Sequence, residues 1–177
     1  MKKILVIGLV VALLATGGVF AYTWTTATAT IGATSVESDF ATITAGANFT
    51  APTVFGKFTG TWPTGTLFTV DPAEGYTGDL VIKVYLVNTG ELIRYYHHLN
   101  MALNLMDSAA TPVIVDEQGE IQVLNLQNAE VQFYWAHGTG TTPLKVELTG
   151  GSFRLHHWKT LAGGSVQPQI WCEVTQR

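Results

Sequence analysis

Apolar and polar residues alternate in many short runs along this chain, and a period of two residues is typical of β-strands. The clearest run spans residues 80–87, where every even-numbered position is Leu, Ile or Val. Its odd-numbered positions are also largely apolar, so we expect a central strand that is covered on both faces.

Shorter alternating runs, separated by turns rich in Gly, Pro and Asn, predict further strands. In residues 130–137 the alternation directs Val131, Phe133 and Trp135 toward the core. The pair Gly150-Gly151 is interpreted as a turn between two strands. The other predicted strands are residues 36–44, 53–58, 66–70, 112–115, 120–126, 144–148, 152–158 and 169–175.

Residues 91–106 admit two interpretations. The Leu, Met and Ala residues from position 92 onward favour a helix. The run Tyr95-Tyr96-His97-His98 and the alternation that follows it favour a long strand or a bent pair of strands, which is the interpretation we adopt.

Many short strands joined by glycine-rich turns predict an all-β protein. We expect a single-domain antiparallel β-sandwich, jelly-roll-like, that occupies residues 36–177 and carries an extended N-terminal strand. The sequence contains no internal repeat and no second domain.

The first 21 residues have the three parts of a secretory signal peptide. Lys2 and Lys3 precede an uncharged apolar segment, and a short stretch rich in small residues ends at Ala21. Cleavage is predicted between Ala21 and Tyr22, which makes the protein secreted. The alternative is a retained membrane anchor, because residues 4–21 approach the minimum length of a transmembrane helix.

Residues 22–35 are predicted to form the extended N-terminal strand. Thr and aromatic residues favour strands, and residues 22–31 contain no Pro and no charge. An unprotected strand of this kind can pair with another chain. The predicted assembly residues are Tyr22, Thr23, Trp24, Thr25, Thr26, Ala27, Thr28, Ala29, Thr30 and Ile31. An ordinary first strand within its own sandwich is the alternative.

Composition narrows the class of protein further. Hydrophobic residues make up 47% of the chain, which argues against disorder. Charged residues make up 12%, the net charge is −4 and no basic patch is present, so nucleic acid is not expected as a partner. Cys172 is the only cysteine, so it is either a buried thiol or the site of an intermolecular bond.

Two short motifs resemble the TasA/camelysin family of secreted biofilm-matrix fibre proteins. One is Gly17-Gly18-Val19-Phe20-Ala21-Tyr22, and the other is the order of turn, strand, Asn88-Thr89-Gly90 and strand across residues 71–106. Together they cover about a third of the chain. The resemblance implies a jelly-roll subunit whose mature N-terminal strand, residues 22–31, completes the sheet of the next subunit. The family often has an acidic residue just after the aromatic residues of the cleavage region, where this chain has Thr25 and Thr26.

Histidines are the most suggestive polar residues, because His is the commonest metal ligand in proteins. Neighbouring residues on a strand point to opposite faces, so each His-His pair can supply one ligand to a given site. The candidate metal ligands are therefore His97, His137 and His157, with half-exposed histidines beside aromatics as the alternative. The sequence has no His-Glu-x-x-His, Gly-x-Ser-x-Gly or P-loop, so we expect no enzyme and no cofactor.

Five tryptophans open a second class of function, a carbohydrate-binding or adhesive sandwich. Trp62, in a Pro/Gly loop, and Trp171 are the candidates for exposed sugar platforms, whereas core packing is the alternative for each. Asn48 begins an Asn-Phe-Thr sequon and is a possible glycosylation site.

Taken together, the patterns predict a structural subunit of an extracellular filament or biofilm matrix that polymerises by N-terminal donor-strand addition. Its expected partners are copies of itself, together with other matrix components or glycans. The membrane is a partner only through residues 1–21, if they are retained. The alternative is a monomeric β-sandwich, secreted or anchored at the cell surface, that acts as an adhesin or binds carbohydrate.

Overall fold

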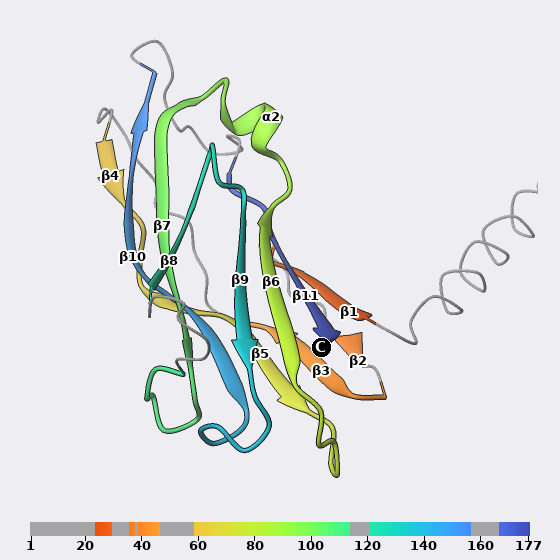
Figure 1. Cartoon of the computed structure of the whole chain (residues 1–177). Helices are drawn as coiled ribbons and strands as arrows, with labels where there is room; N and C mark the ends of the chain where they lie inside the picture. Colours follow the sequence, from red (N-terminus) through yellow and green to blue (C-terminus); the bar gives the residue numbers. More distant parts are fainter. Residues whose placement is uncertain (1–23, 30–35, 38, 47–58, 114–120, 157–166) are drawn as a thin grey trace, which may run out of the picture.

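The computed structural model describes residues 24–29, 36–37, 39–46, 59–113, 121–156 and 167–177. Two antiparallel β-sheets pack face to face in these residues, with one short helix at one end (Figure 1). The predicted all-β sandwich is therefore confirmed. The predicted strand at residues 53–58 lies outside the described residues.

The smaller sheet has four described strands in the order β1-β11-β6-β9. Each neighbouring pair runs antiparallel. The strand β1 lies at one edge and β9 at the other. Their bounds are β1 Trp24–Ala29, β11 Ile170–Gln176, β6 Leu80–Leu86 and β9 Glu130–Trp135.

The larger sheet has seven described strands. Six follow the order β2-β3-β5-β10-β7-β8, and β4 pairs with the far half of β10. The chain crosses between the two sheets repeatedly, so strands that are distant in sequence lie side by side. The bounds are β2 Val36–Glu37, β3 Ala41–Ala45, β4 Thr59–Thr61, β5 Gly65–Pro72, β7 Tyr96–Met106, β8 Ile121–Asn125 and β10 Leu144–Leu155.

The core lies between the sheets and follows the alternation of the strands. In β6 the even-numbered residues are buried, as predicted from their period of two. Val81 is buried as well, whereas Lys83 and Tyr85 are partly exposed on the outer face. In β9 the predicted inward residues Val131, Phe133 and Trp135 are all buried, so that prediction is confirmed.

The central position of β6 is also confirmed, because β6 pairs with β11 on one side and β9 on the other. The expectation that both its faces are covered is wrong, since Lys83 and Tyr85 are partly exposed on the outer face. Its outer face carries a polar contact in which the Tyr85 hydroxyl donates to Glu173 Oε2 at 2.8 Å. Burial and this hydrogen bond both raise the pKa of Tyr85 above its usual value. The tyrosine therefore stays a neutral donor across this sheet.

The segment after β6 departs from the predicted long strand. Residues Thr89–Leu92 form a single helical turn, α2, and β7 begins only at Tyr96. Leu92 is fully buried, whereas Ile93 is 56% exposed. The turn reverses the chain from one sheet to the other, and the alternation that predicted a strand holds from Tyr96 onward.

The prediction of two strands separated by a turn at Gly150-Gly151 is wrong. Residues Leu144–Leu155 form one strand, and the register shifts between Leu148 and Gly150 as in a β-bulge. Gly151 has φ +147°, and an added Cβ would collide with the backbone oxygen of Asn100. Glycine is required there for close approach of two strands rather than for a turn.

The predicted strand at residues 36–44 is instead two strands. Val36–Glu37 and Ala41–Ala45 pair antiparallel with each other, with Val36 opposite Ile43. Phe40, which precedes β3, is buried at 2% exposure. The apolar residues of this segment therefore belong to both arms of a hairpin, which mimics the alternation of one longer strand.

Candidate functional site

The predicted assembly strand is only partly described. Residues Trp24–Ala29 form β1, whereas Tyr22, Thr23, Thr30 and Ile31 lie outside the described residues. In this single chain β1 pairs antiparallel with β11, with Trp24 opposite Thr175 and Ala29 opposite Ile170. The strand thus occupies the edge of the smaller sheet within its own domain.

The edge that β1 covers belongs to a core strand. Ile170, Cys172 and Val174 of β11 are fully buried, and β11 pairs with β6 on its other side. The backbone of β1 also lies close to β2 and β3 of the opposite sheet. Without β1, the backbone groups along one side of β11 would lose their strand partner.

Cys172 lies at the middle of this edge as a free, fully buried thiol. Burial raises the pKa of Cys172, so the thiol resists conversion to the reactive thiolate. Of the two interpretations from the sequence, the buried thiol is confirmed. Its register partner across the edge is Ala27.

The candidate metal ligands do not converge. His137 follows β9, whose Trp135 lies opposite Leu80, whereas His97 lies just beyond α2, which follows Leu86. A strand rises about 3.3 Å per residue, so the length of β6 separates the two histidines by roughly 20 Å. They lie at opposite ends of the sandwich, and His157 lies outside the described residues.

His97 instead contacts His156, with ring centroids 5.7 Å apart and planes at 79°. The Nε2 atom of His156 lies 3.3 Å from the backbone oxygen of Ile93. In the part of the chain that the structure describes, no group of three or more His, Cys, Asp or Glu side chains is arranged to hold a metal ion.

Of the two interpretations of Trp62, core packing is confirmed and exposure is not. Trp62 is 4% exposed, and its ring centroid lies 4.8 Å from that of Phe153 and 6.2 Å from that of Tyr96. Its neighbours Pro63 and Thr64 are exposed, so the Pro/Gly loop lies at the surface while the indole turns inward. We refer to Trp62, Tyr96 and Phe153 as the aromatic cluster.

Trp171, the second candidate platform, is half-buried on the outer face of the smaller sheet, opposite Tyr85. Its Nε1 atom is buried and has no acceptor among the described residues. A buried indole N–H cannot reach a sugar hydroxyl, so the accessible part of Trp171 offers only apolar contact.

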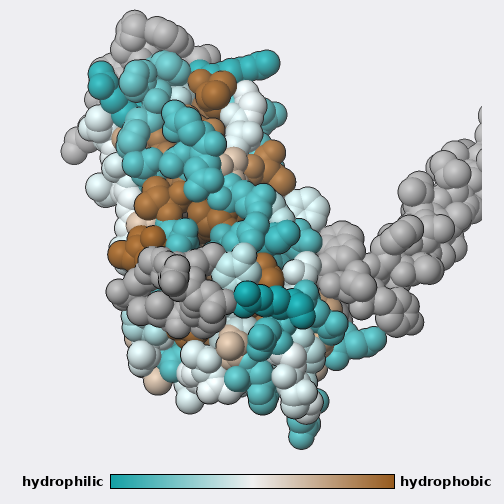
Figure 2. Space-filling view, in the orientation of Figure 1, coloured by the Kyte–Doolittle hydropathy of each residue, from teal (hydrophilic) through white to brown (hydrophobic). Residues whose placement is uncertain are grey.

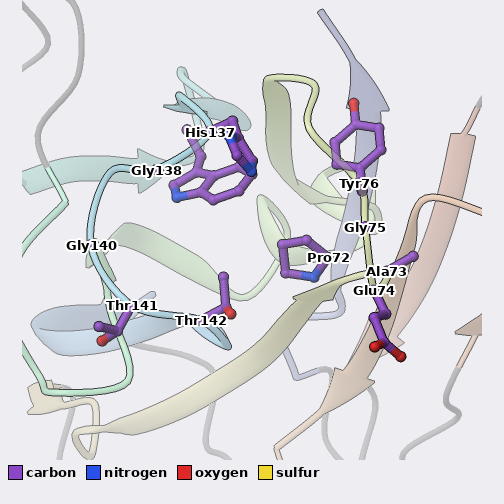
Figure 3. Close-up of a pocket in the computed structure, with 11 residues that line it drawn as sticks. Pro72, Ala73, Glu74, Gly75, Tyr76, His137, Gly138, Gly140, Thr141 and Thr142 are labelled. Carbon is purple, nitrogen blue, oxygen red and sulfur yellow. The ribbon is translucent and has the colours of Figure 1, made fainter.

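A pocket of about 550 Å³ opens at the end of the sandwich opposite α2 (Figure 3). One wall is the turn from β5 to β6, and the other is the loop from β9 to β10. Figure 3 shows Pro72 and Thr142 facing one another across the gap, with Tyr76 and His137 on opposite sides of it. We call this the loop pocket.

Asp79 ties the two walls of the loop pocket together. Its backbone oxygen accepts the Tyr76 hydroxyl at 3.1 Å, and its Oδ1 atom accepts the backbone N–H of His137 at 3.0 Å. Within the loop, Trp135 Nε1 donates to the Thr139 oxygen at 2.8 Å. These hydrogen bonds therefore hold both walls of the loop pocket in place.

Asp107 anchors the same loop from behind. Its Oδ1 atom accepts the Thr111 N–H at 2.8 Å, and its Oδ2 atom accepts the N–H and hydroxyl of Thr141 at 3.3 and 3.2 Å. The backbone hydrogen bond from Thr111, followed by those from Thr141, lowers the pKa of Asp107, although burial opposes the shift. The charged carboxylate thus joins the turn after β7 to the wall of the pocket.

Three side chains of the loop pocket have polar groups that form no hydrogen bond within the described residues: Thr142, Glu74 and the His137 ring. The imidazole of His137 packs edge-on against Trp135, with centroids 6.0 Å apart. Burial, and secondarily the charge of Asp79, raise the pKa of Tyr76. The pocket therefore presents hydrogen-bonding groups beside ring surfaces.

Sequence reasoning did not find the loop pocket. Its walls are turns, and the sequence marks His137 there as a candidate metal ligand rather than as part of a pocket. The run Trp135-Ala136-His137-Gly138 places an aromatic and a histidine at the end of a strand before a flexible glycine, and this was the available signal.

The remaining predicted positions, Ala21 and Asn48, lie outside the described residues. Within the part of the chain that is described, no helix combines the length and apolar character needed to cross a bilayer. Comparison of the sequence with protein-family models and with curated proteins found no match.

Proposed function

We propose that this chain is a structural subunit of an extracellular filament, in which β1 of one subunit pairs with the β11 edge of the next. The observation that carries the proposal is the β1–β11 ladder, which spans six register pairs at the edge of a sheet. A ladder formed between two subunits can repeat all six pairs, so exchange of β1 keeps these contacts while joining the chains.

The composition of β1 supports this use. Natural edge strands are usually protected by charge, Pro or a bulge, and Trp24–Ala29 contains no charge and no Pro. Each main-chain hydrogen bond contributes only about 0.5–1.5 kcal/mol, but a ladder adds several in one cooperative unit. The resemblance of the N-terminal segment to secreted matrix-fibre proteins points to the same role.

Exchange of this kind leads to an open chain of subunits. Each subunit donates a strand at its N-terminal end and accepts one along β11, so the contact joins two different surfaces. A head-to-tail contact that does not close on itself produces a filament. On the face in Figure 2, hydrophobic residues form small separate patches, so the strand edge is a better candidate for the joint than that face.

The register supplies a direct test, because Ala27 lies opposite Cys172. Directly opposed residues of an antiparallel pair have Cβ atoms about 4.5–5.5 Å apart, which is close to disulfide geometry. The variant Ala27→Cys, assembled in reducing buffer and then oxidised, should give a ladder of covalent multimers on a non-reducing gel. Thr26→Cys is the matched control, since its partner is Glu173.

A second variant, lacking residues 22–31, should remain folded but fail to elongate in electron micrographs. If oxidised filaments of Ala27→Cys contain only internally cross-linked monomers, strand exchange is refuted. Filaments from the deletion variant would also refute it. Uniform monomers from the unaltered secreted chain would instead favour the rival, a monomeric adhesin or carbohydrate-binding sandwich at the cell surface.

A further inference from the structure

The loop pocket has the dimensions and fixed walls of a binding site. Its volume of about 550 Å³ falls within the roughly 300–1,000 Å³ typical of small-ligand sites. The hydrogen bonds of Asp79 hold both walls, and those of Asp107 hold the β9–β10 loop. A preformed site of this kind loses little conformational entropy when a ligand binds.

The charges at the pocket narrow the class of ligand. Among the described residues that line it, only Glu74 and His137 can carry charge, and neither Lys nor Arg is present. A phosphate, sulfate or carboxylate ligand would meet no permanent positive charge there, and Glu74 would repel it. An anionic ligand is therefore disfavoured, and a cation would meet only one exposed carboxylate, whose attraction is weak in water. We take the ligand to be neutral.

The polar groups of the loop pocket narrow the class of ligand further. The Thr142 hydroxyl both donates and accepts, the imidazole of His137 offers ring nitrogens for hydrogen bonds, and the Glu74 carboxylate accepts. All three belong to exposed residues. A ligand that satisfies such a mixed set must carry several groups that both donate and accept, as the hydroxyls of a sugar do.

Ring surfaces also line the loop pocket, beside these polar groups. The Pro72 and Tyr76 rings lie on one wall and the His137 imidazole on the other (Figure 3). The C–H faces of a pyranose pack on such rings while its hydroxyls reach the polar groups around them. We infer that the loop pocket binds one unit of a neutral saccharide, held by Thr142 and His137 against the Pro72 and Tyr76 rings.

The inference does not depend on polymerisation, because no lining residue belongs to β1 or β11. In a filament, however, the pocket would repeat once per subunit. Weak sites that repeat along one particle bind a polysaccharide by avidity, which raises apparent affinity by roughly 10²–10⁴. A shallow pocket with a modest affinity for one sugar would then be enough to bind a glycan matrix.

The test is saturation-transfer difference NMR on the full secreted chain, because this method observes the sugar and works for monomers and filaments alike. The probes are glucose, galactose, mannose and N-acetylglucosamine, with glucuronate as the anionic comparison. We expect transfer to the ring protons of at least one neutral sugar and a signal at least several-fold weaker for glucuronate.

Two variants locate the binding. Thr142→Trp fills the pocket and should abolish the transfer, whereas Thr64→Trp should leave it unchanged. Thr64 is a matched control, since it is also exposed but lies just before β5, roughly 25 Å along the strand from Pro72. A circular dichroism spectrum and melting curve identical to those of the parent chain confirm that each variant is folded.

Three results would overturn the inference. They are absence of transfer to every neutral sugar, stronger transfer to glucuronate than to any neutral sugar, and equal transfer in the parent chain and folded Thr142→Trp. Failure here leaves the filament proposal intact, because that proposal is judged by the Ala27→Cys cross-link.

Discussion

The two ends of the sandwich use similar residues to opposite effect. At the end near α2, Trp62, Tyr96 and Phe153 pack ring against ring and are all at most 4% exposed. At the other end, Tyr76, Trp135 and His137 surround the loop pocket. Aromatic residues thus close one end and leave a solvent-accessible pocket at the other.

Glycines show how the difference arises. At the closed end Gly60 makes room for the Phe153 ring, because an added Cβ would lie 2.5 Å from it. At the open end an added Cβ at Gly75 or Gly138 would meet nothing within 4 Å. Gly75 and Gly138 have φ +80° and +83°, so at these two positions glycine serves the turn conformation, whereas Gly60 serves the packing of a ring.

The largest expected effect comes from breaking the closed end. Trp62→Ala removes a buried indole and leaves a cavity beside Phe153 and Tyr96, so it should lower the free energy of unfolding by about 3–5 kcal/mol. Denaturant unfolding measures this loss. Trp171→Ala is the control and should cost clearly less, since Trp171 is only half-buried. An equal loss of unfolding free energy in the two variants would mean that the aromatic cluster stabilises the fold no more than a half-buried surface tryptophan does.

The variant Trp62→Ala also bears on the rival function, a monomeric carbohydrate-binding sandwich. Loss of sugar binding in Trp62→Ala would suggest a tryptophan platform if Trp62 were exposed. Because Trp62 is buried, such a loss would report damage to the fold instead. The rival function therefore has to be tested at the loop pocket, where the lining side chains Thr142 and His137 are exposed.

A smaller effect is expected where the loop pocket is anchored. Asp107→Asn keeps the shape of the side chain but removes the charge that accepts from Thr111 and Thr141. Because the folded-state pKa of Asp107 is lowered, its stabilisation is fully present above the ordinary value of 3.8. It is lost as the pH falls below 3.8 and through the folded-state pKa.

Melting temperature as a function of pH tests this. Asp107→Asn should melt below the parent chain at neutral pH, and the gap should close in acid. Asp71→Asn is the control, because Asp71 is exposed on β5. A gap that stays constant down to strongly acidic pH would show that the charge of Asp107 does not stabilise the loop.

The sequence predicted regular parts well and irregular parts poorly, for physical reasons. The strands β6 and β9 were predicted closely because their alternation is set by burial of one face. Gly150-Gly151 was misread because glycine serves both turns and close strand contacts, and the partner Asn100 is distant in sequence. The sequence left Trp62 open between exposure and core packing and did not indicate the loop pocket, because both depend on contacts between distant segments, which no local pattern records.

The smallest expected effect tests whether the open end is preformed. Tyr76→Phe removes only the hydroxyl that donates to the Asp79 oxygen, and this oxygen still accepts the Arg177 N–H at 3.1 Å. No buried acceptor is left unsatisfied, so the free energy of unfolding should fall by about 0.5–1.5 kcal/mol. Sugar binding, measured by the same saturation transfer, should weaken modestly because the ring remains while its wall loses one anchor. A loss of stability like that of Trp62→Ala would show instead that the walls of the loop pocket stabilise the sandwich as a whole, and the contrast between the two ends would fail.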